Sequence, residues 1–390
     1  MQITGKTRIR FILADPVEQV VASHKSNLRY EEEGLDIAVF PLAQQRGYHQ
    51  TSAQVIHNSI EQTVVAEQAG FDAAWYAEHH FNNYSLSPSP LMTIAHVAGK
   101  TSKIRLGSAV CILPLYHPAR FLAEVGFVDT VSGGRLELGV GSGYQEFEFA
   151  RFGTNLADAP AIYNEFLDVL PMGLTQKTFS YSGKHIQIPD SAIAVRCTQQ
   201  PMPPIWVTSG NPLTLGRAVR ENHNLFVTAL LGGNDALANL RERLEKIAGD
   251  NGKDLDRDVK FGLLRCGFAS DKESEIQSYL DNARFQRRLS ESLKFRTQQS
   301  DDGYLIKEVP SDTDMSLEQM RSNLPVGSVN EVIDKLLEEI SILRPKHIAL
   351  QTQLGDLDQN MMLRQIELWG ERIIPAVRKE VERMAAPAAR

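Results

Sequence analysis

The sequence predicts an α/β fold, a (β/α)8 TIM barrel with insertions after the first and seventh strands. Three observations lead to this prediction. The chain has 390 residues, 42% hydrophobic and 23% charged, an ordinary composition for a soluble globular protein with a large core. Eight apolar runs, rich in β-branched residues and bounded by turn signals, are typical of buried parallel strands. Helical patterns lie between these runs, and eight such alternations favour a closed barrel over an open doubly wound sheet.

The expected strands are short and follow one another along the whole chain. They cover residues 9–14, 73–77, 104–113, 136–141, 204–209, 225–230, 259–269 and 347–354. The helix expected at 52–70 ends on Gly70, a good C-terminal stop. The helix expected at 328–340 opens with Ser328 as its N-cap, and Glu331 three residues later completes a capping box.

Three long segments interrupt the alternation: residues 177–203 precede the fifth expected strand and belong to the opposite face, and the other two follow a strand. Residues 17–50 come after the first expected strand, and residues 281–325 come after the seventh strand and its first helix. Strand-to-helix connections open on the C-terminal face of a barrel, where active sites lie. Long connections often act as lids, so we expect 281–325 to form a mobile lid. We expect residues 1–390 to form one domain with a frayed tail at 384–390.

The composition argues against several classes of partner. The chain has 41 Lys and Arg against 48 Asp and Glu, a formal charge of -7, so we expect no nucleic-acid partner. The apolar run near the N-terminus is too short for a signal peptide, and no stretch approaches a membrane span. Three widely spaced cysteines, Cys111, Cys197 and Cys266, form neither a disulfide framework nor a zinc pattern. We therefore expect a cytoplasmic protein that does not bind membranes.

Glu78, His79 and His80 follow the apolar residues of the second expected strand, at its C-terminal end. Adjacent residues of an extended chain point to opposite sides, so the two histidines do not chelate one metal while extended. The H-E-x-x-H spacing of helical zinc sites is absent, and we expect no metal. Two interpretations remain open: a solvated loop, or a titratable pair with a catalytic role at the active end of the barrel.

The third expected strand contains three consecutive small residues, Gly107, Ser108 and Ala109. Small residues in mid-strand allow a flat ligand to approach the backbone closely. Tight packing inside a narrow barrel explains them equally well, so both interpretations stay open.

The fourth expected strand runs into a glycine-rich turn with the pattern G-x-G-x-G. This pattern differs from the G-x-G-x-x-G of dinucleotide-binding folds. It indicates a tight strand-to-loop turn in which Ser142 and Tyr144 offer hydroxyl groups to a ligand.

The fifth expected strand ends at a capped helix start. Asn211 is a suitable N-cap and Pro212 a suitable first helical residue. The N–H groups of this helix start, flanked by Ser209 and Gly210, form an anion pocket that suits a phosphate. An ordinary capped helix is the competing interpretation.

Taken in order, the motifs WYAEHHF, the block at 104–153 and PPIWVTSGNPLT resemble the bacterial luciferase-like flavin-dependent monooxygenase family. The similarity covers about residues 52–375. It implies an enzyme that binds FMN, as reduced FMNH2 supplied by a separate flavin reductase, and uses O2 to oxygenate a small organic substrate. It also implies a homodimer.

The resemblance assigns roles to individual residues. Glu78, His79 and His80 fall on the family's catalytic positions. His79 is expected to handle protons, with Glu78 fixing its tautomer through a hydrogen bond, and His80 is expected to be mainly structural. A non-prolyl cis peptide is expected at Ala109–Val110, beside the flavin ring. Contacts to the cofactor are expected from Ser108, Ala109, Val110, Ser142, Tyr144, Ser209, Gly210 and Thr214.

The sequence also departs from luciferase itself. Gly141 and Ser142 replace its reactive cysteine and phosphate-binding arginine, and Ser209 replaces a glutamate. The segment 17–50 has no luciferase counterpart. These differences argue against light emission on an aldehyde and for another substrate within the broad family.

Three other functions remain as alternatives. The first is a deazaflavin (F420)-dependent oxidoreductase on the same fold, which transfers a hydride instead of oxygen. The second is a metal-dependent barrel hydrolase that uses His79 and His80. The third is a non-catalytic flavin-binding subunit, against which the intact Glu-His-His motif and phosphate loop speak.

Overall fold

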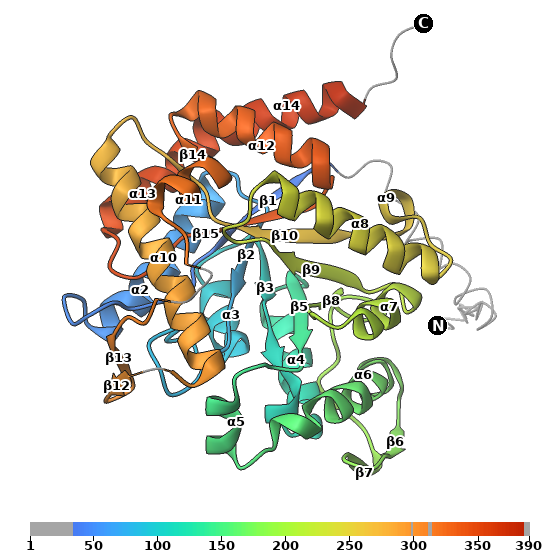
Figure 1. Cartoon of the computed structure of the whole chain (residues 1–390). Coiled ribbons are helices and arrows are strands. Elements are labelled where there is room, and N and C mark those ends of the chain that lie inside the picture. Colours follow the sequence, from blue (N-terminus) through green and yellow to red (C-terminus); the bar gives the residue numbers. More distant parts are fainter. Residues whose placement is uncertain (1–33, 298, 311–313, 386–390) are drawn as a thin grey trace, which may run out of the picture. The chain divides into compact units, whose positions relative to one another are not determined.

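The barrel predicted from the sequence is present. The computed structural model describes residues 34–297, 299–310 and 314–385. Its main sheet is parallel throughout and closes on itself, because β1 pairs with both β2 and β15 and the third strand pairs with β5 (Figure 1). The barrel strands are β1 (Asp36–Phe40), β2 (Ala73–Tyr76), β3 (Arg105–Ser108), β5 (Leu136–Gly141), β8 (Ile205–Val207), β9 (Asn224–Thr228), β10 (Phe261–Arg265) and β15 (His347–Gln351). A short strand, β4 (Cys111–Ile112), continues the third position and also pairs with β5.

The first barrel strand is not the one predicted. The run at 9–14 lies outside the described residues, and β1 lies inside the segment predicted as an insertion at 17–50. Residues Ile37–Phe40 are all buried, and Ile37 pairs with Ile348 while Ala38 pairs with Ala73. The connection after β1 is therefore much shorter than predicted and ends at Thr51, the N-cap of the next helix.

Helices cover the outside of the barrel (Figure 1). They are α2 (Ser52–Gln68), α3 (Pro90–Ala98), α4 (Pro118–Val131), α6 (Ala159–Thr175), α7 (Pro212–Arg220), α8 (Asn234–Asp250), α9 (Leu255–Asp258), α12 (Val329–Leu343), α13 (Gln359–Leu368) and α14 (Ile374–Ala385). The short helix α5 (Glu146–Phe152) lies in the connection after β5. The predicted caps are confirmed: the Asn211 side chain accepts from Leu213 N, and Ser328 with Glu331 forms a capping box. Between α6 and β8, an antiparallel hairpin joins β6 (Phe179–Ser182) and β7 (Gln187–Ser191).

The connection after β10 contains more regular structure than the loop predicted at 281–325. It contains β11 (Phe268–Ala269), α10 (Glu273–Phe295), the antiparallel hairpin of β12 (Gln299–Asp301) and β13 (Tyr304–Lys307), α11 (Leu317–Asn323) and β14 (Val326–Gly327). The first part of the predicted lid therefore belongs to a long helix. Ile276, Leu280 and Ala283 are buried at helical spacing along it.

Aromatic rings fill the barrel interior. The rings of Trp75 and Trp206 meet edge to face with centroids 5.2 Å apart, and Trp75 Nε1 donates to His347 Nε2 at 2.8 Å. A Cβ added to Gly107 would lie 2.2 Å from the Trp75 ring. Close packing against Trp75 therefore explains the glycine at this position. Within the described residues, no helix is both long and apolar enough to cross a membrane.

Candidate active site

The predicted site residues gather at the C-terminal ends of four strands that are consecutive around the barrel, β2, β3, β5 and β8. The Glu-His-His motif follows β2, Ala109 and Val110 follow β3, the glycine-rich turn follows β5, and Ser209 and Gly210 follow β8. Carboxyl ends of parallel strands meet on one face of a barrel. One sector of that face therefore holds all four motifs.

His79 is paired with a carboxylate that the sequence did not suggest. Its Nδ1 lies 3.0 Å from the Oε1 of Glu148, a residue of α5 that is only 1% exposed. The His79 ring packs edge-on against Tyr84, with centroids 4.4 Å apart. None of the described residues hydrogen-bonds His79 Nε2. Because a carboxylate accepts from Nδ1–H, the neutral ring presents Nε2 as an acceptor.

The prediction that Glu78 fixes the tautomer of His79 is wrong. Glu78 Oε1 accepts from His80 Nε2 at 2.9 Å, and its Oε2 accepts from Ile112 N at 3.1 Å and from Tyr116 Oη at 2.7 Å. Residues two apart in an extended chain share one side, so Glu78 faces His80 and not His79. The Glu78 carboxylate joins the Glu-His-His segment to the segment after β3.

The peptide between Ala109 and Val110 is cis, as the family resemblance predicts. Both residues are half-buried. Ser108 is fully buried, and its hydroxyl donates to Gly139 O at 2.8 Å while accepting from Gly139 N at 2.9 Å. The Ser108 hydroxyl thus bridges β3 and β5 and does not face the open end of the barrel.

The glycine-rich turn reaches the helix α10. Tyr144 Oη lies 3.4 Å from Ser290 Oγ on α10 and accepts from Gln145 Nε2 at 3.1 Å. Ser142 is half-buried, with its Oγ 3.5 Å from Gly143 O. Gln145 is fully buried, and its Oε1 has no hydrogen-bond partner among the described residues.

The helix α10 covers the surroundings of His79 from the side of Tyr84. Gln286 Nε2 donates to Tyr84 Oη at 2.7 Å, and Phe285 and Leu289 pack with the Tyr84 ring. Burial raises the pKa of Tyr84 well above its ordinary value, so its hydroxyl stays protonated at neutral pH. The segment predicted as a lid therefore does border the candidate site, as a helix instead of a loop.

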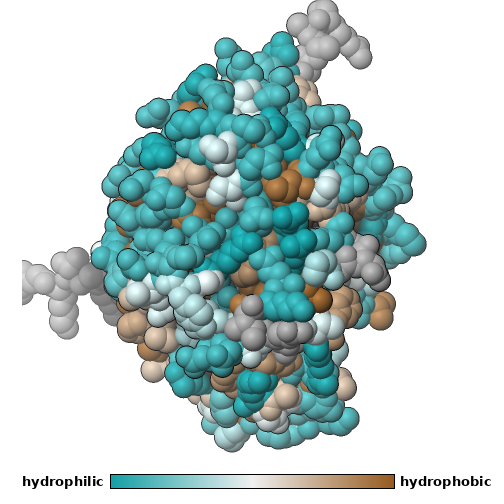
Figure 2. Space-filling view, turned by 60° about the vertical axis from the view of Figure 1, so that its left-hand side comes forward, coloured by the Kyte–Doolittle hydropathy of each residue, from teal (hydrophilic) through white to brown (hydrophobic). Residues whose placement is uncertain are grey.

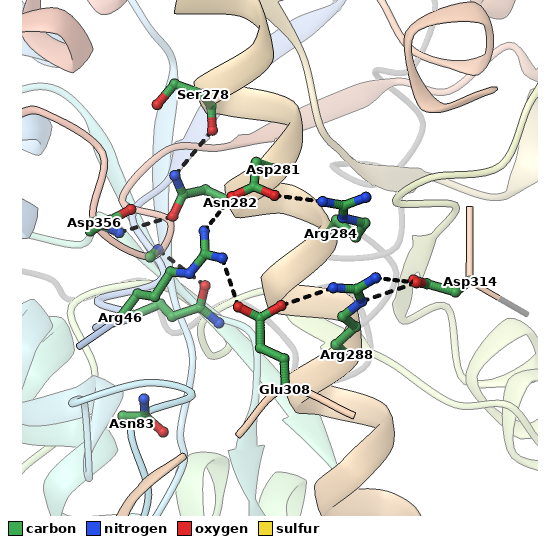
Figure 3. Close-up of polar contacts among 12 residues, drawn as sticks. Arg46, Asn83, Ser278, Asp281, Asn282, Arg284, Arg288, Glu308, Asp314 and Asp356 are labelled. Atoms are coloured by element: carbon green, nitrogen blue, oxygen red, sulfur yellow. Dashed lines mark hydrogen bonds and ion pairs between the residues drawn. The ribbon is translucent and has the colours of Figure 1, made fainter. Parts of the chain in front are cut away.

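A charged cluster holds α10 and the β12–β13 hairpin against the connection after β1 (Figure 3). Arg46 binds Asp281 of α10 and Glu308, which follows the hairpin, each at 2.6 Å. Arg288 of α10 binds Glu308 at 3.1 Å and also pairs with Asp314. Figure 2 shows this side of the molecule, which is mostly hydrophilic with small apolar areas. We refer to the residues of this charged cluster as the latch: Arg46, Asp281, Arg288, Glu308 and Asp314.

The loop after β8 forms a capped turn before α7. Ser209 Oγ accepts from Asn211 N at 3.0 Å, which shapes the turn before α7, and Thr214 lies half-buried in its first turn. Gly210 is exposed, and a Cβ added there would meet nothing within 4 Å. Arg243 of α8 donates from Nη2 to Gly210 O at 2.5 Å.

Four residues near the predicted motifs were not suggested by the sequence: Tyr84, Gln145, Glu148 and Arg243. Glu148 lies in the glycine-rich block, but nothing local in EFEFARF distinguishes it from Glu146. Arg243 is one of several charged residues along the amphipathic helix α8, and nothing in the local sequence distinguishes it from the others. The fold brings Glu148 close to His79 and Arg243 close to Gly210, although each pair comes from two different connections or helices of the barrel. Among the described residues, no group of three or more His, Cys, Asp or Glu side chains could hold a metal ion.

Comparisons with known proteins agree with the fold and show the family. The luciferase-like monooxygenase family matches residues 35–343. The chain is 62% identical over 352 residues to the uncharacterized protein y4vJ of Sinorhizobium fredii (strain NBRC 101917 / NGR234), covering 90% of this chain and 100% of that protein. It is 28% identical over 293 residues, 74% of this chain and 81% of the relative, to the oxygenase component of the flavin-dependent trigonelline monooxygenase of Acinetobacter baylyi.

Solved structures share the fold at low sequence identity. The FMN complex of the oxygenating constituent of 3,6-diketocamphane monooxygenase from Pseudomonas putida aligns with a TM-score of 0.70 at 20% identity, covering 88% of this chain and 98% of that one. An F420-dependent secondary alcohol dehydrogenase aligns with a TM-score of 0.67 at 17% identity, covering 88% and 99%. The family match spans most of the barrel and all four strand ends that carry the site. The chain is therefore an oxidoreductase that belongs to the luciferase-like monooxygenase family.

Proposed function

We propose that this chain is the oxygenase component of a two-component system. It takes reduced FMN from a separate flavin reductase and uses O2 to oxygenate a small organic substrate. The observation that carries the proposal is the gathering of four motifs on consecutive strand ends, with His79 at one side and the capped helix start of α7 at the other. The trigonelline relative, itself an oxygenase component, supports the two-component arrangement. A homodimer and a cytoplasmic location belong to the same proposal.

The residues present suit FMN. Arg243 and the first-turn N–H groups of α7 offer positive charge and donors for a phosphate, and the open space above Gly210 leaves room for it. Gln145 Oε1, buried and without a partner among the described residues, is an acceptor that a ring N–H of a reduced flavin can satisfy. Ser209 and Thr214 flank the proposed phosphate position, and Ala109 with Val110 the proposed ring position.

When bound, reduced flavin supplies the electrons that activate O2. The residues of the protein orient the reactants, shield them from water and move protons. His79 Nε2 is the group that takes up or delivers a proton at the reacting end. The helix α10, with the buried Tyr84 beneath it, shields the site from water on that side. Glu78 and His80 hold the connections after β2 and β3 together.

The second candidate is hydride transfer with a deazaflavin, favoured by the fold shared with the F420-dependent dehydrogenase. The two are separated by anaerobic titration of the purified chain with reduced FMN and, in parallel, with reduced F420. We expect reduced FMN to bind at one site per chain, and admission of air to produce O2 consumption by the complex. Binding of reduced F420 together with failure to bind reduced FMN would overturn the proposal in favour of the second candidate.

A further inference from the structure

We propose that Glu148 is a positioning residue that fixes His79 as the Nδ1–H tautomer and so reserves its Nε2 for the reaction. This inference deepens the proposed function, because it rests on His79 as the proton-handling group. It assigns to α5, and not to the adjacent residue Glu78, the carboxylate that orients the catalytic histidine.

The geometry around Glu148 is that of an orienting carboxylate. Its Oε1 accepts from His79 Nδ1 at 3.0 Å and from the backbone N of His80 at 2.7 Å. The second bond ties the carboxylate to the main chain beside the ring that it holds. Glu148 is 1% exposed and His79 9% exposed, so water competes little for either group. Charge-assisted hydrogen bonds of this kind are about twice as strong as neutral ones.

The other described neighbours of His79 are less well placed than Glu148 to accept a hydrogen bond from its Nδ1–H. Tyr84 contacts His79 through ring edges, and the Tyr144 ring centroid lies 6.2 Å from that of His79. Gln145 Nε2 lies 3.4 Å from His79 Nδ1 at the long limit of a hydrogen bond. Glu148 is therefore the charged group that faces His79 within hydrogen-bonding distance in the described residues.

Glu78 provides a matched control within the same motif. It is equally buried, at 3% exposed, and it too accepts from a histidine, but that histidine is His80. Its two oxygens are occupied by three donors and none comes from His79. If the pairing in the structure is the functional one, loss of the Glu78 charge changes His80 and leaves His79 as it was.

The test is the tautomer of His79 in the flavin-free protein. Histidine is labelled with ¹⁵N, two-bond ¹H–¹⁵N spectra are recorded at about pH 8, where an ordinary histidine is neutral, and the His79 signals are assigned by their loss in His79→Gln. We expect His79 to be the Nδ1–H tautomer. In Glu148→Leu the ratio of Nδ1–H to Nε2–H should fall roughly 10- to 100-fold, the loss expected for a hydrogen bond to a charged group.

Two conservative variants complete the design. Glu148→Gln keeps an oxygen that can accept from Nδ1–H, so it should retain the wild-type tautomer. Glu78→Gln should leave the His79 signals unchanged and alter those of His80. A wild-type His79 found as the Nε2–H tautomer overturns the inference without any variant, and so does a His79 that responds to Glu78→Gln but not to Glu148→Leu. Titration of wild type with reduced FMN separately tests the proposed function, because the tautomer is measured without flavin.

Discussion

At the scale of single residues, two adjacent histidines have different surroundings. Each has one ring nitrogen bound to a buried carboxylate: His79 Nδ1 to Glu148, and His80 Nε2 to Glu78, whose carboxylate also holds Ile112 and Tyr116. In both rings the other nitrogen has no hydrogen-bond partner among the described residues. The difference therefore lies in the carboxylates: Glu78 links His80 to the segment after β3, which suits His80 to holding segments together, and His79 is the histidine to which the proposed function assigns proton transfer.

We therefore expect different effects from two alanine substitutions. His79→Ala should still bind reduced FMN, but substrate oxygenation should slow by about 10²–10⁴-fold, the usual cost of losing a general acid or base. It should also lose about 1–3 kcal/mol of stability, because the buried carboxylate of Glu148 loses a donor. His80→Ala should retain more activity and lose about 1–3 kcal/mol of stability, because Glu78 loses a buried donor. Peroxide yield, product yield and thermal melting measured on both variants check this. Unchanged coupling of oxygen use to product in His79→Ala would contradict it.

Arg243 is the residue whose substitution tests the phosphate position. Arg243→Gln should weaken binding of reduced FMN by roughly 3- to 10-fold, less than a fully buried charged hydrogen bond, because Arg243 is exposed. Ser209→Asp should weaken it as well, since a carboxylate would lie beside the phosphate. The measurement is an anaerobic titration with reduced FMN and with reduced riboflavin, which has no phosphate.

The riboflavin titration serves as the control, because its affinity should be the same in wild type and Arg243→Gln. Arg220→Gln is a matched substitution at the far end of α7, where the guanidinium donates to Asn251 Oδ1 at 2.6 Å. It should leave both affinities unchanged. Equal losses for FMN and riboflavin in Arg243→Gln would place the phosphate elsewhere.

At the scale of elements, we expect the latch to determine how firmly α10 and the β12–β13 hairpin are held beside the site. Glu308 is its central member, since it binds both Arg46 and Arg288. Glu308→Gln should increase the rate of tryptic cleavage at Arg296 or Lys307 by roughly 2- to 10-fold, the range that two partly exposed ion pairs can supply. Reduced FMN should slow the cleavage, because closure over a ligand stabilises the covered state.

Glu124→Gln is the control for this experiment, because it removes an i,i+4 ion pair with Arg120 on α4. Its cleavage pattern should match that of wild type. If trypsin cuts first outside 296–310 in the flavin-free protein, or if Glu308→Gln cuts no faster, the latch does not control the cover.

The latch also has a defined pH dependence. Burial alone would raise the pKa of Asp281, but the hydrogen bonds and charges of Arg46 and Arg284 outweigh it and lower the pKa below the ordinary value of 3.8. A carboxylate whose pKa is lowered by folding stabilises the folded state above its ordinary pKa, and the contribution is lost as the pH falls through the lowered value. The protection due to Asp281 should thus be complete above about pH 5, begin to decline near the ordinary aspartate pKa of about 4, and be lost as the pH falls through the lowered value, measured with an acid protease.

The elements that the sequence predicted well are those whose signals are local. Two helix starts are marked by capping residues that lie within four positions of each other: Ser328 with Glu331, and Asn211 with Pro212. β1 was missed because five residues after an acidic stretch gave too short a run to compete with the longer one at 9–14. α10 was read as a loop beyond residue 280 because its polar outer face obscures the buried spacing of Ala283 and Leu289.

The location of the candidate site could be predicted from the sequence, but most of its side-chain contacts could not. Strand ends placed His79, Val110 and Gly210 on one face without any knowledge of distance. The pairing of His79 with Glu148 depends on how two connections meet in space, and sequence proximity suggested Glu78 instead. Similarly, the choice between ligand approach and packing at Gly107 needed the position of Trp75.

At the scale of the whole molecule, barrel closure depends on β1. Its residues pair with β15 along its full length, and the compact unit that contains the barrel begins at Leu35. A chain that begins at Pro41 lacks β1 and should not fold cooperatively. A circular dichroism melt compared with that of the full chain checks this. A cooperative melt close to that of the full chain would show that closure does not depend on β1.

The order of the strands around the barrel also bears on how such enzymes diversify. The four strand ends proposed to hold the cofactor are neighbours, and the opposite side of the ring consists of β9, β10, β15 and β1. The largest connection, with α10 and the β12–β13 hairpin, follows β10 on that opposite side. Grafting this connection from a relative should therefore exchange substrate preference as a module, while the half-barrel from β2 to β8 continues to recognise the same coenzyme.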